Sequence, residues 1–277
     1  MNRMESICRG SSGKMFYGSG NMKNNDVMKY RWLLQELISR DLKIKYRRSF
    51  LGYLWSILNP LLMMAILTVV FSRMFRFEIA NYPVYLLAGQ LIFTFFVEAT
   101  TVSMQSVLSG ASLIKKVYLP KLIFPLSKTL SGLVNLGFSL VALFVVVFAT
   151  GNGFHITLVL LPLFLVYVLV FTMGVSLLVS TLVVFFRDTQ YLYGLFLTAL
   201  NYLTPIFYPV SMLPQWLQEL MVVNPMYNYV TMFRKIILYG QWPSLWEHGV
   251  CIAFSIGTLV LGYYVFKKKE KDFILYI

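Results

Sequence analysis

Long uncharged stretches, separated by short charged or proline-containing breaks, dominate the chain. A helix needs about 20 mostly apolar residues to cross the hydrocarbon core of a membrane. The stretch 129–186 is far too long for one such helix, and the glycine-rich turn at 150–153 divides it into two. Six transmembrane helices are therefore predicted, near residues 53–73, 84–108, 128–149, 156–186, 189–204 and 247–266. We expect an all-α integral membrane protein with one six-span domain at 53–272.

The segment 29–50 mixes basic side chains with an apolar stripe. Leu34, Ile38 and Leu42 recur at every fourth residue, which is the spacing of one helix face. A cationic amphipathic helix of this kind lies in the headgroup plane, as an anchor, a docking element for a partner, or both. The preceding residues 1–28 are polar and contain no apolar run typical of a signal peptide, so we expect a flexible cytoplasmic extension.

Two further segments are neither simple spans nor simple loops. Gly110 and Pro120 bound a short predicted helix near 112–121, whose apolar side chains stand among lysines and suit contact with a protein or with lipid. The region 205–240 is apolar but is broken by four prolines. It is predicted to form short re-entrant helices on the outer side, since irregular backbone at membrane depth is tolerated where it lines a cavity.

Composition supports the membrane assignment. Hydrophobic residues make up 58% of the chain and charged residues 13%, against about 45–50% and 25% in soluble domains. The net charge of +13 follows the predicted topology, because 20 of the 24 Lys and Arg fall in segments assigned to one side of the membrane. This asymmetry indicates cytoplasmic termini, and it explains the charge without nucleic acid.

Chemistry that would indicate an enzyme is missing from the sequence. There is no phosphate-binding loop of the Gly-x-x-x-x-Gly-Lys type, and His155 and His248 lie outside any metal-ligand spacing. We therefore expect no catalytic residue and no metal ligand. Glu98 is the one charge well inside a predicted span, either as a hydrogen-bonded structural residue or as a group that lines a pathway. Aromatic residues gather around the fifth span, where they form either plain packing or a surface for sugar rings.

Five motifs, in this order, resemble the membrane subunits of type-two ABC exporters that move bacterial polysaccharides such as O-antigen, teichoic acid, capsule and rhamnose-rich wall polymers. The resemblance covers about residues 29–272. The motifs are RDLKIKYRRSFLGYLWSILNPLL from Arg40, KKVYLPKLIFPL from Lys115, VFFRDTQ from Val184, TPIFYPVSMLP from Thr204 and NPMY from Asn224.

The resemblance implies a permease domain at 53–272 that performs no bond chemistry. It implies a homodimer of this chain with two copies of an ATP-binding subunit, which binds the ATP and Mg, so that this chain carries no cofactor of its own. The substrate would be a lipid-linked polysaccharide, and the location the cytoplasmic (inner) membrane.

The resemblance also assigns residues. The segment 112–121 corresponds to a coupling helix that seats in the ATP-binding subunit, flanked by the interfacial helix and by the turn between spans four and five. The ATPase-docking residues are Ile114, Lys115, Lys116, Val117, Tyr118, Leu119, Arg40, Asp41, Tyr46, Arg187 and Asp188. The family's aromatic channel points to Trp55, Tyr202, Phe207 and Tyr208, and mid-span Glu98 is a fifth channel candidate.

Three other functions compete with glycan export. A drug or lipid ABC exporter of the same type would share most of these motifs. An ion-coupled carrier would depend on Glu98 and would work without an ATP-binding subunit. An acyl- or glycosyltransferase is disfavoured by the missing acid–base constellation.

Overall fold

The computed structural model describes residues 30–46, 52–75, 79, 81–117 and 119–276. These residues form helices joined by turns, and none of them belongs to a β-strand. The all-α class and the membrane character predicted from the sequence are confirmed. The predicted extension at 1–28 and the end of the interfacial segment, 47–50, lie outside the described residues.

Within the described residues, four helical segments are long and apolar enough to cross a membrane. They are α5 (Tyr82–Met104), α8 (Ile123–Ala149), the 3-10 turn η2 (Ile156–Leu160) with α9 (Leu161–Phe185), and α13 (Leu245–Lys269). The predicted first and fifth spans correspond to α4 (Trp55–Phe75), preceded by the turn η1 (Gly52–Leu54), and α10 (Thr189–Leu203). The apolar part of α4, Trp55–Phe71, and the 15-residue α10 are shorter, and the count of six stays a prediction.

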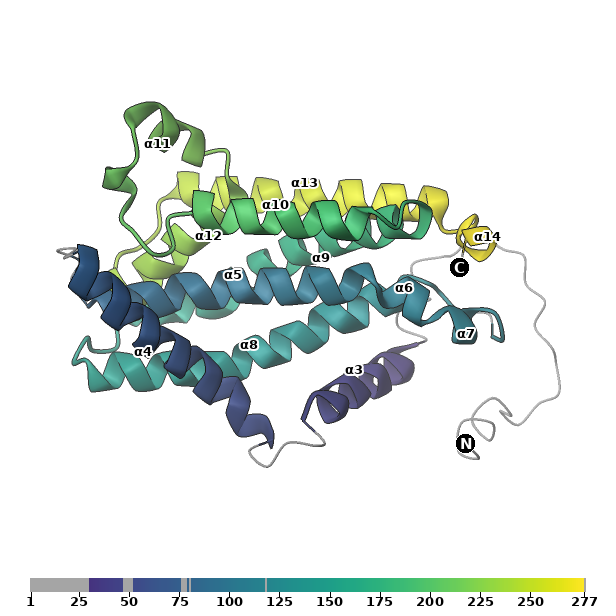
Figure 1. The fold of residues 1–277 in the computed structure, drawn as a ribbon, viewed down its shortest axis with the longest axis horizontal. Coiled ribbons are helices and arrows are strands. Elements are labelled where there is room, and N and C mark those ends of the chain that lie inside the picture. The colour runs from purple at the N-terminus through teal and green to yellow at the C-terminus, as the bar shows by residue number, and fades with distance from the viewer. Residues whose placement is uncertain (1–29, 47–51, 76–78, 80, 118, 277) are drawn as a thin grey trace.

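The long helices run side by side, and α4 crosses α5 and α8 obliquely (Figure 1). α5 is at the centre, and Val84, Leu86 and Ile92 on it have no exposed surface. α9 and α13 cross at two glycines. A Cβ on Gly262 would lie 2.2 Å from the carbonyl oxygen of Gly174, so only glycine allows the two backbones this close.

One end of the bundle carries α3 (Arg31–Tyr46), α6 (Ser106–Ser109), α7 (Ala111–Ile114) and α14 (Phe273–Tyr276) (Figure 1). α3 packs against α8 with Leu37, which is 4% exposed, whereas the predicted stripe of Leu34, Ile38 and Leu42 is only half-buried. The helix predicted near 112–121 is shorter than expected. It ends at Ile114, and the backbone N–H groups of Lys116 and Val117 both donate to the carbonyl of Leu113 in a closing turn.

The opposite end holds η3 (Val210–Met212), α11 (Gln215–Met221), α12 (Pro225–Arg234) and the π-helical turn η4 (Lys235–Tyr239) (Figure 1). Asn224 explains the NPMY motif. Its Oδ1 accepts hydrogen bonds from the backbone N–H groups of Met226 and Tyr227, at 3.0 and 3.3 Å, while Pro225 occupies the first helical position. The Nδ2 of Asn224 donates to Thr204 Oγ1 at 3.1 Å, which ties the start of α12 to the end of α10.

Candidate functional site

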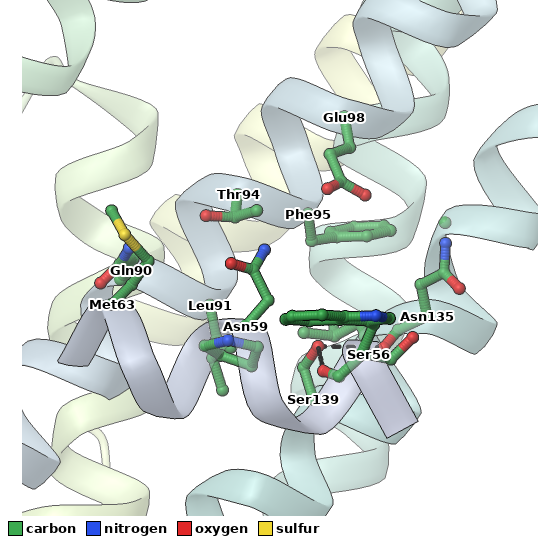
Figure 2. A pocket seen from close by; sticks show the side chains of 14 residues that line it. Ser56, Asn59, Met63, Gln90, Leu91, Thr94, Phe95, Glu98, Asn135 and Ser139 are labelled. Atoms are coloured by element: carbon green, nitrogen blue, oxygen red, sulfur yellow. Dashed lines mark hydrogen bonds between the residues drawn. The ribbon is translucent and has the colours of Figure 1, made fainter. Parts of the chain in front are cut away.

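A cavity of about 340 Å³ lies between α4, α5 and α8 (Figure 2). Each helix contributes residues from a single face, at spacings of three or four. On α5 the polar members are Gln90, Thr94 and Glu98, which are four residues apart. The complete lining is Trp55, Ser56, Asn59, Pro60, Met63, Gln90, Leu91, Thr94, Phe95, Glu98, Gly132, Asn135, Leu136 and Ser139.

The lining combines amides, hydroxyls and flat rings with a single carboxylate. In Figure 2 the carboxylate of Glu98 and the ring of Phe95 lie close together on one side of the cavity. Ser139 Oγ donates to the backbone carbonyls of Ser56, at 3.3 Å, and of Asn135, at 3.1 Å, which links α8 to α4. Amides and hydroxyls both donate and accept hydrogen bonds, so the site suits a neutral, hydroxyl-rich ligand with an apolar face.

Glu98 is the one acidic or basic side chain in this lining. The lining residues include no histidine, cysteine or lysine that could act as a base or nucleophile. Across the described part of the chain, no group of three His, Cys, Asp or Glu side chains could hold a metal ion.

The cavity brings together two of the five channel candidates, Trp55 and Glu98. The other three lie at the far end of α10. The ring of Phe207 stacks on Phe71 of α4, with centroids 5.4 Å apart, and the Tyr208 hydroxyl donates to the Tyr202 carbonyl at 2.6 Å. Tyr202 itself is 67% exposed. The candidates therefore form two separate groups.

After α10 the chain leaves the helix, and side chains of α5 and α12 satisfy its backbone carbonyls. Arg234 donates from Nη1 to Pro205 O at 2.9 Å and from Nη2 to Ile206 O at 2.8 Å. Tyr82 donates to the next carbonyl, that of Phe207, at 2.8 Å. Tyr85 donates to Tyr208 O at 3.0 Å. An irregular segment can persist among apolar helices only when its polar groups are paired in this way.

Arg234 is the main residue that the sequence did not reveal. It is 5% exposed, and its Nε also donates to the Tyr85 carbonyl at 3.1 Å. In the sequence, Arg234 stands next to Lys235 and resembles an ordinary loop cation. The residue types give no sign of its burial, because its partners are backbone carbonyls. Apart from Glu98, the polar residues of the cavity were also not identified from the sequence, although polar residues at helical spacing on apolar helices were a usable signal.

At the end of the bundle that carries α3, Asp41 joins that helix to α8. Lys128 Nζ lies 2.7 Å from Asp41 Oδ1, and both side chains are largely buried. Arg40 lies 3.7 Å from the same carboxylate with a more exposed side chain. Tyr46 is the last residue of α3.

The other docking candidates divide into an anchor and an exposed set. Ile114 is 7% exposed and packs inward, and Leu119 is half-buried. Tyr118 lies outside the described residues. The exposed candidates are Lys115, Lys116, Val117, Arg187 and Asp188.

Most of the chain is similar to known membrane proteins. Residues 33–238 match the family model described as ABC-2 type transporter. The O-antigen export system permease protein RfbA of Klebsiella pneumoniae is 31% identical over 244 residues, which is 87% of this chain and 93% of the relative. A protein of the same name from Myxococcus xanthus is 29% identical over 250 residues, 90% of this chain and 96% of the relative. The polysialic acid transport protein KpsM of Escherichia coli is 23% identical over 243 residues, 86% and 93% of the two chains.

Proposed function

Since the chain belongs to the ABC-2 type transporter family, we propose that it is the permease subunit of a transporter that exports a cell-surface polysaccharide across the cytoplasmic membrane. The observation that carries this proposal is similarity to polysaccharide-export permeases along nearly their whole length, 93% and 96% for the two O-antigen proteins. The substrate is a lipid-linked glycan, and this chain is the conduit rather than an enzyme.

The cavity between α4, α5 and α8 supports a sugar substrate. Trp55 and Phe95 offer ring faces to the C–H faces of a sugar, and Asn59, Gln90 and Asn135 offer amides to its hydroxyls. Weak contacts at several positions hold a chain without trapping it, which conduction requires. Trp55 and Glu98 would meet the glycan here, and Tyr202, Phe207 and Tyr208 further along the path.

Energy comes from a separate ATP-binding subunit, which binds the ATP and Mg. Two permeases and two ATP-binding subunits form the transporter, and the glycan passes along the seam between the permeases. The permease spans the membrane six times, with α4 and α10 as its first and fifth spans. The lysine-rich end with α3, α7 and α14 faces the cytoplasm, together with both termini.

Nucleotide-driven closure of the ATP-binding subunits moves the docking residues around Lys115, Val117 and Arg187. Closely packed helices carry that displacement to the cavity and to the outer end, because packed interfaces shift as units rather than compress. The Asp41–Lys128 pair makes α3 move with α8.

The test is export in cells. Deleting this gene, or disabling the ATP-binding subunit, should remove the glycan from the surface and leave it inside, lipid-linked. Asn135→Leu and Trp55→Ala should lower surface glycan while the permease still binds the ATP-binding subunit. Val69→Ala on α4, which is 64% exposed and lies outside the cavity, is the control.

Two results would contradict the proposal. Unchanged surface glycan in the deletion strain, with loss of resistance to a drug, would indicate a drug exporter of the same type. Transport by the purified chain alone under a pH gradient, lost in Glu98→Gln, would indicate an ion-coupled carrier.

A further inference from the structure

A second group of buried apolar residues lies apart from the main core, at the end of the bundle that carries α7 and α14. It draws on α6, α7, α8, α9, α13 and α14. We call it the end cluster; its members are Val107, Ile114, Phe124, Leu177, Val184, Phe266 and Phe273. The end cluster joins elements that are more than 150 residues apart in the sequence.

Phe273 is the centre of the aromatic contacts in the end cluster. Its side chain has no exposed surface. Its ring is 5.2 Å from that of Phe266 and 5.9 Å from that of Phe185 at the end of α9. Tyr276 adds a contact with Phe185, with ring centroids 4.9 Å apart. α14 is therefore fixed to the end of α9, immediately before the Arg187–Asp188 turn.

Polar contacts fix the same segment to the loop that follows α7. The Lys121 ammonium donates to the carbonyl oxygen of Glu270 and lies 5.6 Å from the centroid of the Phe273 ring. Burial lowers the pKa of Lys121, and the nearby Glu270 and Asp272 oppose this shift. Lys267 pairs with Glu270 at 3.2 Å and holds the turn between α13 and α14.

The anchored segment presents apolar side chains to the outside. Ile274, Leu275 and Tyr276 are 56%, 81% and 52% exposed. The preceding residue, Phe273, shares the end cluster with Ile114 of α7, and α7 leads into the exposed Lys115, Lys116 and Val117. The same end of the bundle thus exposes apolar side chains from two segments, with polar residues beside them, and exposed apolar groups rimmed by polar residues are typical of a protein contact.

We propose that the C-terminal segment Phe273–Tyr276 is a third part of the surface on which the ATP-binding subunit docks, in addition to the loop after α7 and the Arg187–Asp188 turn. Phe273 anchors it, and Leu275 is its main contact. This inference rests on the proposed function. The partner favoured by the surrounding lysines is an ATP-binding subunit whose docking groove has an acidic rim.

The alternative occupant is an anionic lipid surface. The protein partner is favoured by continuity, because Phe273 is packed against the same helix ends, α7 and α9, that carry the other two parts of the surface. A lipid anchor would not require a fixed position relative to these helix ends.

The experiment is co-purification of the ATP-binding subunit with tagged full-length permease in detergent. Leu275→Asp should lower the retained subunit about tenfold or more, as expected for loss of a central contact. The amount and melting temperature of the permease itself should stay unchanged. Phe273→Ala should lower retention as well, and Phe273→Leu should largely restore it. Ile274→Asp provides a second surface variant should Leu275→Asp accumulate poorly.

Leu220→Asp is the matched control, because Leu220 is a 54% exposed leucine on α11 at the opposite end of the bundle. It should retain the ATP-binding subunit fully. Full retention of the ATP-binding subunit by both Leu275→Asp and Ile274→Asp would overturn the assignment. If those variants instead lost binding to anionic vesicles, the segment would be a membrane contact. If wild-type permease retained no ATP-binding subunit, the proposed function itself would fail.

Discussion

The guanidinium carbon of Arg234 lies 3.4 Å from the centroid of the Tyr85 ring. A cation is thus held over an aromatic face inside the protein, where the attraction is strongest because water is excluded. The same arginine donates to the carbonyls of Pro205, Ile206 and Tyr85. α5, α12 and the irregular segment after α10 are therefore joined through one side chain.

Arg234→Met should destabilise the protein strongly. The substitution removes three hydrogen bonds from a charged donor, each expected to contribute about 1.5–3 kcal/mol, although Pro205 O keeps the Tyr85 hydroxyl at 3.4 Å. We expect a clearly lower melting temperature in detergent and faster proteolysis in the region 205–225. Lys235→Met is the control, since its partly exposed pair with Glu247, at 2.7 Å, is expected to contribute only about 0–1 kcal/mol. Equal stability of the two variants would contradict the role given to Arg234.

Gly89→Ala tests the space that Arg234 needs. A Cβ at Gly89 would lie 2.6 Å from Arg234 Nη2 and 3.3 Å from a methyl group of Ile206. Overpacking of this kind is expected to cost about 1–3 kcal/mol of unfolding free energy. Gly137→Ala in the middle of α8 is the control, because nothing lies within 4 Å of its Cβ position. The control should match or slightly exceed the wild-type melting temperature. A stabilised Gly89→Ala protein would show that the guanidinium is placed differently.

The Asp41–Lys128 pair should show energetic coupling. The pair joins α3 to α8 at 2.7 Å and is mostly shielded from water, so a double-mutant cycle with Asp41→Asn and Lys128→Met should give a coupling of about 0.5–3 kcal/mol. The readout is the melting temperature, together with proteolysis between α3 and α4. The exchanged pair Asp41→Lys with Lys128→Asp should recover part of the loss. Strict additivity of the single substitutions would count against the link.

Gly262→Ala should disrupt the crossing of α9 and α13. The added carbon would meet the Gly174 carbonyl oxygen at 2.2 Å, and a backbone atom cannot move aside as a flexible side chain can. We expect a large loss of folded protein in the membrane fraction. Gly257→Ala, on the same helix with nothing within 4 Å of its Cβ position, should accumulate normally. Similar yields of the two proteins would mean that the helices cross elsewhere.

Hydrophobic patterning was sufficient for the class of the protein and for the order of its helices. α10 ends at Leu203 because Pro205 follows, and α12 begins at Pro225 because Asn224 can cap it. Such boundaries depend on local chemistry, which the sequence displays. The helix that begins at Ala111 is shorter than the sequence predicts, because an apolar run that contains lysines is compatible with a helix and with a turn.

Features that depend on distant partners were not accessible from one sequence. The family resemblance points to Trp55 and the position inside a span points to Glu98, but they share a cavity only because α4 crosses α5. The burial of Arg234 depends on carbonyls 28 and 29 residues away, which have no signature in the residue types. The anchoring of Phe273 depends likewise on helix ends far from it along the chain.

The crossing of α9 and α13 also bears on how the chain matures. Among the long helices of the described residues, α13 is synthesised last, so the Gly174 face of α9 meets Gly262 only then. The Tyr229 hydroxyl likewise meets Ser255, its partner at 2.7 Å, only then. Until that helix inserts, the Gly174 face of α9 and the Tyr229 hydroxyl have no partner from α13. The packing of α9 and α12 against residues 245–269 can therefore form only after the other long helices of the described chain have been synthesised.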